Sequence, residues 1–100
     1  MEIRFSASLW IWPTDKASWY FVCLTPAAAE QVRFAMQGQA RRGFGSVKVE
    51  VRLVDQVWRT SLFPDKARNS YLLPIKAQVR KACDLKLDEN LFITLRLVEV

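Results

Sequence analysis

The residues best suited to bind a ligand lie in one short basic segment, Arg41-Arg42-Gly43-Phe44-Gly45-Ser46. Glycines let backbone N–H groups turn toward one point, and arginine guanidinium groups add forked donors that match phosphate or carboxylate oxygens. Arg59 is expected on the exposed face of a strand that pairs with the strand after this loop. The sequence therefore predicts an anion-binding site formed by Arg41, Arg42, Gly43, Phe44, Gly45, Ser46, Arg59 and Lys66.

A plainer interpretation of the same segment is a connection between a helix and a strand. In that case the two glycines only satisfy backbone geometry, and Phe44 fills the interior of the fold. One Gly-x-Gly motif does not separate these alternatives.

Catalytic chemistry is not predicted. The chain contains no histidine, which removes the commonest general base, the commonest partner of a nucleophilic serine or cysteine, and the commonest metal ligand. Cys23 lies in an apolar run and is predicted to be a buried thiol. Cys83 follows two cations at the end of a helix, where a thiolate is disfavoured. We expect no enzyme activity, no catalytic residue, no cofactor and no metal.

The charge distribution indicates the class of partner. Net charge is +5, and residues 41–81 carry ten basic and three acidic side chains. This excess favours an anionic small molecule or partner protein, with nucleic acid as the alternative. Two cysteines without paired spacing predict a reduced, cytoplasmic protein, and the lack of a leader or an apolar span predicts no membrane contact. A monomer is favoured, although the sequence does not determine the oligomeric state. Trp19 and Trp58 are expected in the core, whereas Trp10 and Trp12 fall on the polar face of the first strand.

The apolar periodicity predicts the elements that position these residues. Alternation over 3–11, 47–53, 58–63 and 91–97 is typical of half-buried strands, and the apolar run 18–24 is expected to be a strand buried on both faces. Thr25-Pro26 predicts a helix start, with the helix ending near Gln37. A second helix is expected to start at Pro74, after a short strand over 70–73.

The order β-β-α-β therefore occurs twice. Shared signs are Asp15-Lys16-Ala17 with Asp65-Lys66-Ala67, and Gln31-Val32-Arg33 with Gln78-Val79-Arg80. Neither half could bury its apolar faces alone. The sequence predicts one domain over residues 1–100, a mainly β fold with two short helices. The expected form is a small double-split β-barrel of two halves, approximately 1–53 and 57–100, related by a pseudo-twofold axis and capped by the helices.

Three segments resemble the bacterial Domain of Unknown Function 1905 family. They are Arg41-Arg42-Gly43-Phe44-Gly45-Ser46-Val47, Trp58-Arg59-Thr60-Ser61-Leu62-Phe63-Pro64-Asp65-Lys66 and Tyr71-Leu72-Leu73-Pro74-Ile75-Lys76. The resemblance covers nearly the whole chain and implies a double-split β-barrel with capping helices. It implies no particular activity.

Residues 71–97 are also similar to the half-barrel unit of AbrB-type transition-state regulators and antitoxins, which bind DNA as pairs of chains. The similarity rests on Leu73-Pro74, Arg80, Leu85 and Leu87. This chain carries Asp88-Glu89-Asn90 where that unit usually has a glycine turn. The similarity implies a nucleic-acid-binding module as the alternative function.

Overall fold

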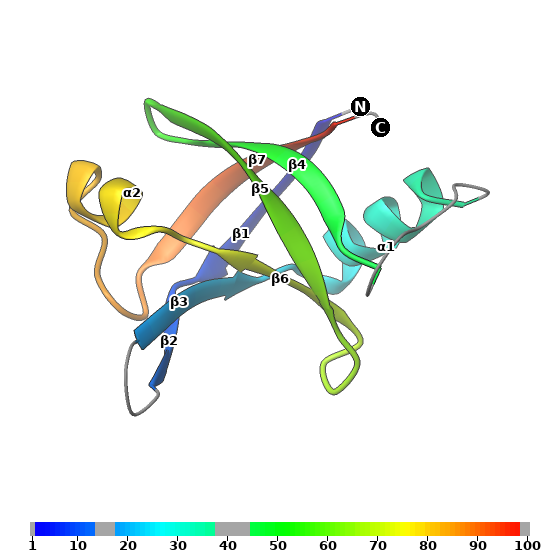
Figure 1. The fold of residues 1–100 in the computed structure, drawn as a ribbon, viewed down its shortest axis with the longest axis horizontal. Coiled ribbons are helices and arrows are strands. Elements are labelled where there is room, and N and C mark those ends of the chain that lie inside the picture. Colours follow the sequence, from blue (N-terminus) through cyan, green and yellow to red (C-terminus); the bar gives the residue numbers. More distant parts are fainter. Residues whose placement is uncertain (1, 14–17, 38–44, 99–100) are drawn as a thin grey trace.

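The structure, a computed structural model, describes residues 2–13, 18–37 and 45–98. Its elements in chain order are β1 (Glu2–Ser8), β2 (Trp10–Pro13), β3 (Ser18–Cys23), α1 (Pro26–Ala35), β4 (Val47–Leu53), β5 (Gln56–Asp65), β6 (Ser70–Pro74), α2 (Ala77–Ala82) and β7 (Asn90–Leu97). The strands form one antiparallel sheet in the order β1-β7-β4-β5-β6-β3-β2. The sheet curls into a half-barrel with the helices on opposite sides (Figure 1). The predicted mainly β class with two helices is confirmed.

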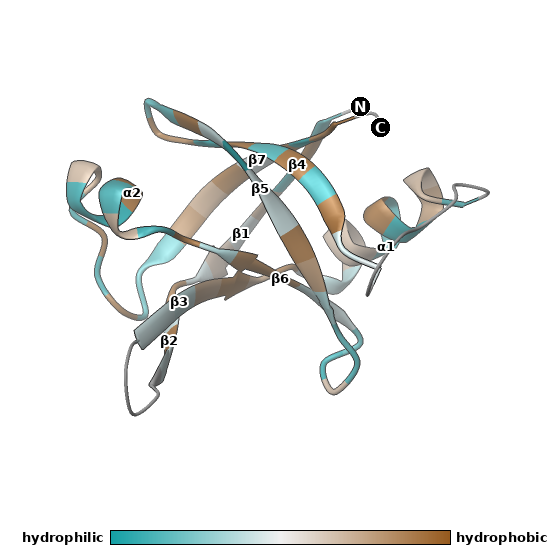
Figure 2. Cartoon of the chain, viewed as in Figure 1, coloured by the Kyte–Doolittle hydropathy of each residue, from teal (hydrophilic) through white to brown (hydrophobic). Residues whose placement is uncertain are grey.

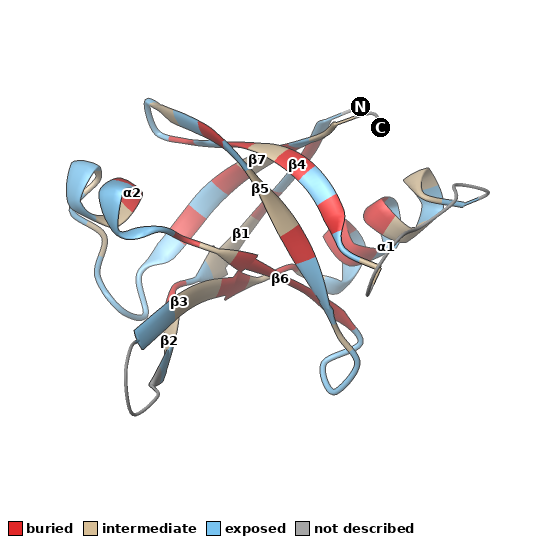
Figure 3. Cartoon of the chain, in the orientation of Figure 1, coloured by how far each residue is buried: buried red, intermediate tan, exposed pale blue. Residues whose placement is uncertain are grey.

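Strict alternation along β4 and β7 determines which side of the sheet faces the interior. Val47, Val49, Val51 and Leu53 are buried, and their neighbours in β4 point outward. Figures 2 and 3 show the same alternation as bands of hydropathy and burial along β4. The β4–β5 hairpin pairs Val47 with Leu62 and Leu53 with Gln56. The predicted face of β4 is therefore confirmed.

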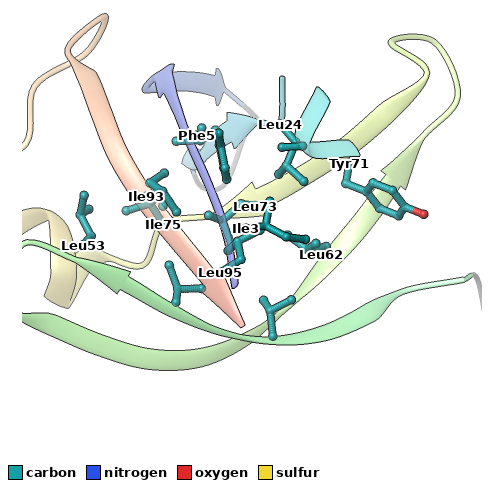
Figure 4. Close-up of a cluster of buried hydrophobic side chains, with 14 of the residues drawn as sticks. Ile3, Phe5, Leu24, Leu53, Leu62, Tyr71, Leu73, Ile75, Ile93 and Leu95 are labelled. Atoms are coloured by element: carbon teal, nitrogen blue, oxygen red, sulfur yellow. The ribbon is translucent and has the colours of Figure 1, made fainter. Parts of the chain in front are cut away.

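The core lies inside the curl of the sheet. Side chains from distant strands meet there, including Ile3 of β1, Leu62 of β5, Leu73 of β6 and Leu95 of β7, each completely buried. Figure 4 shows these side chains converging from their separate strands. Both helices add to this cluster through buried valines, Val32 of α1 and Val79 of α2.

The first helix begins as predicted and the second does not. The Thr25 hydroxyl accepts a hydrogen bond from the Ala28 N–H at 3.2 Å, and Pro26 occupies the first turn. Pro74, however, is the last residue of β6 and not a helix start. The β3–β6 ladder continues through a bond from the Ile75 N–H to the Tyr20 carbonyl at 2.9 Å. The extended chain therefore runs on, and α2 begins at Ala77.

Three further predictions were wrong. Pro64 does not end its strand, because β5 continues to Asp65 after its pairing with β4 stops at Leu62. β3 is not buried on both faces, since the side chain of Trp19 is 57% exposed on the outer face. Cys23 is half-buried rather than buried. All three follow from the curl, which leaves the outer face of β3 and one edge of β5 uncovered.

The tight turn between β4 and β5 contains backbone strain. Val54 has a φ of 55° although its side chain is β-branched. Left-handed backbone places Cβ close to the carbonyl oxygen and costs about 1–2 kcal/mol in a residue other than glycine. The hairpin therefore forms without the glycine or asparagine that such turns favour.

We predict that Val49→Asp unfolds the domain or destabilises it by about 4 kcal/mol or more, because an unpaired carboxylate would enter the core. Urea unfolding followed by circular dichroism measures this effect. Lys48→Asp places the same side chain one residue away on the exposed face and should change the free energy of unfolding by about 0.5 kcal/mol or less. Equal losses in both variants would contradict the assigned face.

We predict that Val54→Gly raises the free energy of unfolding by about 1 kcal/mol, because glycine adopts positive φ without a Cβ clash. The matched control is Val57→Gly, at an exposed valine of β5 with ordinary strand backbone. There the loss of β-propensity should lower stability by about 1 kcal/mol. The two glycine variants should therefore shift the urea midpoint in opposite directions.

Candidate functional site

The glycine-containing loop lies mostly outside the part of the chain that the structure describes. Arg41, Arg42, Gly43 and Phe44 fall in the segment 38–44. Gly45 has a φ of 80°, the positive backbone angle that glycine adopts without a clash. Ser46 is exposed and directly precedes β4. The proposed cradle of Arg41, Arg42 and the loop backbone therefore stays a prediction.

Arg59 and Lys66 occupy separate places along the same stretch of chain. Arg59 lies on the outer face of β5 and pairs in register with Glu50. Ser46 is four residues before Glu50 on β4, a separation of roughly 13 Å at strand spacing. Lys66 is exposed in the turn after β5, beside a shallow hollow that Arg33 also lines. The described geometry thus does not bring Arg59 next to Gly45 and Ser46.

Arg59 belongs instead to a row of alternating charges across four strands. Glu2 is opposite Arg96, Arg96 is opposite Glu50, and Glu50 is opposite Arg59. The Arg59 Nε lies 3.8 Å from the Glu50 Oε2, and the arginine side chain is 73% exposed. Such exposed pairs contribute about 0–1 kcal/mol each. The Arg59 guanidinium is therefore only loosely held by Glu50.

Arg59 also lines a cleft of about 270 Å³ between β3, β5 and the start of α2, which we call the β3–α2 cleft. Three cations and three aromatic residues line it: Arg59, Lys76, Arg80, Trp19, Tyr20 and Trp58. Among the described residues, no carboxylate is part of this lining. The cleft therefore combines flat apolar walls with three cations, of which only Arg59 has a carboxylate partner among the ion pairs of the described residues, and that pair is long and exposed.

Tertiary contacts fix Arg80 within this cleft. Its guanidinium carbon lies 3.6 Å from the centroid of the Tyr20 ring, a cation–π contact. Its Nε also donates to the Ile75 carbonyl at 3.3 Å. Arg80 is thus oriented in advance, and one face of the Tyr20 ring is occupied.

Lys76 and Trp19 form the more open part of the cleft. The bond between Ile75 and Tyr20 extends the β3–β6 ladder. One step further along that ladder, Lys76 comes level with Trp19. Both side chains are exposed. A ring that contacts the Trp19 indole could therefore bring an attached anionic group to the Lys76 ammonium.

Sequence reasoning assigned Arg59 to the loop cradle with Arg41 and Arg42, and it did not single out the other residues that line this cleft with Arg59, namely Lys76, Arg80, Trp19 and Tyr20. The only signal was that Lys76 and Arg80 fall off the apolar stripe of the second helix. Their meeting with Arg59 depends on the β3–β6 and β5–β6 registers, which periodicity cannot specify.

The outer face of β2 and β3 is unusually aromatic. Trp10 pairs in register with Phe21, and Trp12 pairs with Trp19. The ring centroids of Trp10 and Phe21 are 5.4 Å apart, and those of Trp10 and Trp12 are 6.2 Å apart. Trp12 is 52% exposed. The prediction that Trp10 and Trp12 lie outside the core is confirmed, as is the burial of Trp58, but Trp19 joins the exposed set.

The surroundings of Cys83 disfavour its thiolate form. Burial, followed by the negative charges of Asp55 and Glu89, raises the pKa of the Cys83 thiol. Cys83 is therefore protonated at neutral pH and a poor nucleophile.

In the described part of the chain, no three histidine, cysteine or acidic side chains are grouped so as to hold a metal ion. The described helices are all too short or too polar to span a bilayer.

The structure defines a small mainly β domain, a curled antiparallel half-barrel with a basic, aromatic cleft beside β3 and α2. Residues 5–95 match the family model described as Domain of unknown function (DUF1905), and the chain belongs to that family. The resemblance noted in the sequence is therefore confirmed. No curated protein matches the chain.

We predict that Asp65→Asn lowers stability at neutral pH and that the difference disappears in acid. A hydrogen bond from Arg68 lowers the pKa of Asp65 below the ordinary value of about 3.9. The stability linked to this carboxylate is then present above pH ~3.9 and lost as pH falls through the lower folded-state pKa. Thermal melts of both proteins between pH 7 and pH 2 should converge at the acid end. Parallel curves would exclude this linkage.

Proposed function

We propose that this domain binds a small anionic ligand in the β3–α2 cleft and performs no chemistry on it. The observation that carries the proposal is the set of three cations, Arg59, Lys76 and Arg80, in a cleft whose described lining contains no carboxylate. Lysine and arginine donors form charge-assisted hydrogen bonds with phosphate, sulfate or carboxylate groups. The lack of histidine supports a binding role over catalysis.

The aromatic walls restrict the ligand further. Arg80 covers one face of the Tyr20 ring and Trp58 is buried, which leaves Trp19 as the exposed ring of the cleft. A ligand that joins a flat ring to an anionic group would contact Trp19 and Lys76 together. Simple aryl phosphates have this form.

A nucleic-acid-binding module is the alternative. Exposed Trp12 and Trp19 lie side by side across the β2–β3 pair, and successive bases can stack on such rings. Nucleic-acid binding would depend steeply on salt, because neutralised phosphates release counterions. Binding of a single aryl phosphate would not have this steep dependence.

The unpaired cysteines Cys23 and Cys83 support a reducing, cytoplasmic location.

We also propose that the half-barrel is a double-split barrel of two β-β-α-β halves. In support, the β2–β3 pair corresponds to the β5–β6 pair, and the β1–β7 pair corresponds to the β5–β4 pair. The remaining pairs, β4–β7 and β3–β6, would lie on the pseudo-twofold axis.

We predict that Lys76→Gln weakens phenyl phosphate binding by about tenfold, the loss of one charge-assisted hydrogen bond worth ~1.4 kcal/mol. Tryptophan fluorescence and the ligand-induced rise in melting temperature both measure this affinity. The matched control is Lys81→Gln, which removes the same charge from an exposed residue of α2 that does not line the cleft. Lys81→Gln should bind like the parent protein. Neither exposed lysine should matter for folding.

Equal weakening by the two glutamine variants would mean that only general charge attracts the ligand. Tight, salt-sensitive binding of a single-stranded oligonucleotide without a response to phenyl phosphate would favour the nucleic-acid alternative.

A further inference from the structure

A second cleft, of about 440 Å³, lies where β3 ends, α1 begins and the 66–69 turn enters β6. We call it the β3–α1 cleft. Trp10, Leu24 and Pro26 give it apolar walls, and Cys23, Asn69 and Arg68 also line it. Its volume falls within the range of about 300–1,000 Å³ that is common for small-molecule sites.

The two clefts lie at opposite ends of the β3–β6 pair. At the centre of that pair, Val22 is opposite Leu73, a separation of 51 positions. The Leu24 N–H donates to the Tyr71 carbonyl at 3.0 Å, and the Ile75 N–H donates to the Tyr20 carbonyl at 2.9 Å. Leu24 and Ile75 are 51 positions apart, and so are Tyr20 and Tyr71, so each of these hydrogen bonds is the counterpart of the other. The backbone on either side of Val22 and Leu73 is therefore built in the same way.

The same shift relates the walls of the two clefts. Cys23 and Leu24 correspond to Pro74 and Ile75, and Pro26 corresponds to Ala77; each of these lines its own cleft. Likewise, Asn69 and Ser70 of the β3–α1 cleft correspond to Ser18 and Trp19 of the β3–α2 cleft. Five residues of one cleft thus have their counterparts in the other. The two clefts are therefore built on equivalent parts of the backbone.

The side chains that give the β3–α2 cleft its charge are absent from the second cleft. The counterpart of Lys76 is Thr25, whose hydroxyl caps α1, and the counterpart of Arg80 is the buried Ala29. Arg68 is the cation of the β3–α1 cleft, and it forms an ion pair with Asp65. Its guanidinium carbon also lies 4.8 Å from the centroid of the Trp10 ring. Positive charge in this cleft is therefore already compensated.

We propose that the β3–α1 cleft is a second binding site, which takes an uncharged aromatic ring carrying a hydrogen-bonding group. The ring packs on Leu24 and Pro26 at the edge of Trp10, and the amide of Asn69 pairs with the polar group. This site goes beyond the anion site of the β3–α2 cleft, since each cleft has its own lining and one is proposed to take an anionic ligand, the other an uncharged one.

Protection of Cys23 from alkylation tests the proposal, with indole as the probe. The experiment uses the Cys83→Ser protein, so that Cys23 is the only thiol. Indole should slow alkylation by N-ethylmaleimide in a saturable way, about tenfold at ten times its dissociation constant. In urea, indole should have no effect on the rate, which excludes a reaction between indole and the reagent.

Amide chemical shifts provide a second readout that does not depend on thiol reactivity. Indole should shift the Leu24, Asn69 and Ser70 amides, and phenyl phosphate should shift those of Tyr20 and Lys76 instead. Indole shifts confined to the β3–α2 cleft, or an alkylation rate unaffected by indole, would overturn the second site. Neither result would depend on whether phenyl phosphate binds, so the two proposals fail independently.

Discussion

The fold depends on a change of strand partner at a single residue, Leu9. β1 pairs with β7 as far as Ser8, and β2 pairs with β3 from Trp10 onward. The Leu9 N–H donates to the Glu89 carbonyl at 3.1 Å, and its own carbonyl accepts from the Asp88 N–H at 2.8 Å. Its side chain is 1% exposed. β1 and β2 are the first and last strands of the sheet, and Leu9 is the one residue between them. The two edges of the sheet are therefore held close together, and the sheet must curl. The curl encloses the core and limits exposed edges.

The sequence was most informative where one face of a strand is fully buried. Val47 to Leu53 alternates because only one side of β4 faces the core, so both its period and its face could be predicted. The run over residues 18–24 was wrongly predicted to be buried on both faces, because bulky aromatic residues suit a pleated strand whether or not anything covers them. Thr25-Pro26 predicted a helix start through local chemistry. Pro74 was misleading because proline also suits a strand whose N–H side is unpaired, and at Pro74 β6 pairs with β3 alone.

The candidate site shows the same limit of prediction. Alternation correctly placed Arg59 on the outer face of β5, although the sequence assigned it to the loop cradle and not to this cleft. Its neighbours in the cleft come from β3 and α2, and they reach it only through the register of β6 with β3 and with β5. Periodicity gives the face of a residue but not its neighbours across the sheet. Charge counting located the basic middle of the chain but could not distinguish Lys76, which lines the cleft, from Lys81, which does not.

Arg59 lies where two different outer surfaces meet. On one side is the row of alternating charges from Glu2 to Arg59, and on the other is the aromatic surface around Trp19. Because its pairing with Glu50 is exposed and 3.8 Å long, turning the guanidinium toward the cleft costs little. Arg80, in contrast, is fixed by Tyr20 and the Ile75 carbonyl. The cleft therefore combines one preorganised cation with one that can adjust, on a backbone hydrogen-bonded through the β3–β6 pair. Where the same backbone recurs beside α1, threonine and alanine stand at the positions of Lys76 and Arg80, so a few side chains set the charge of each cleft without altering the fold.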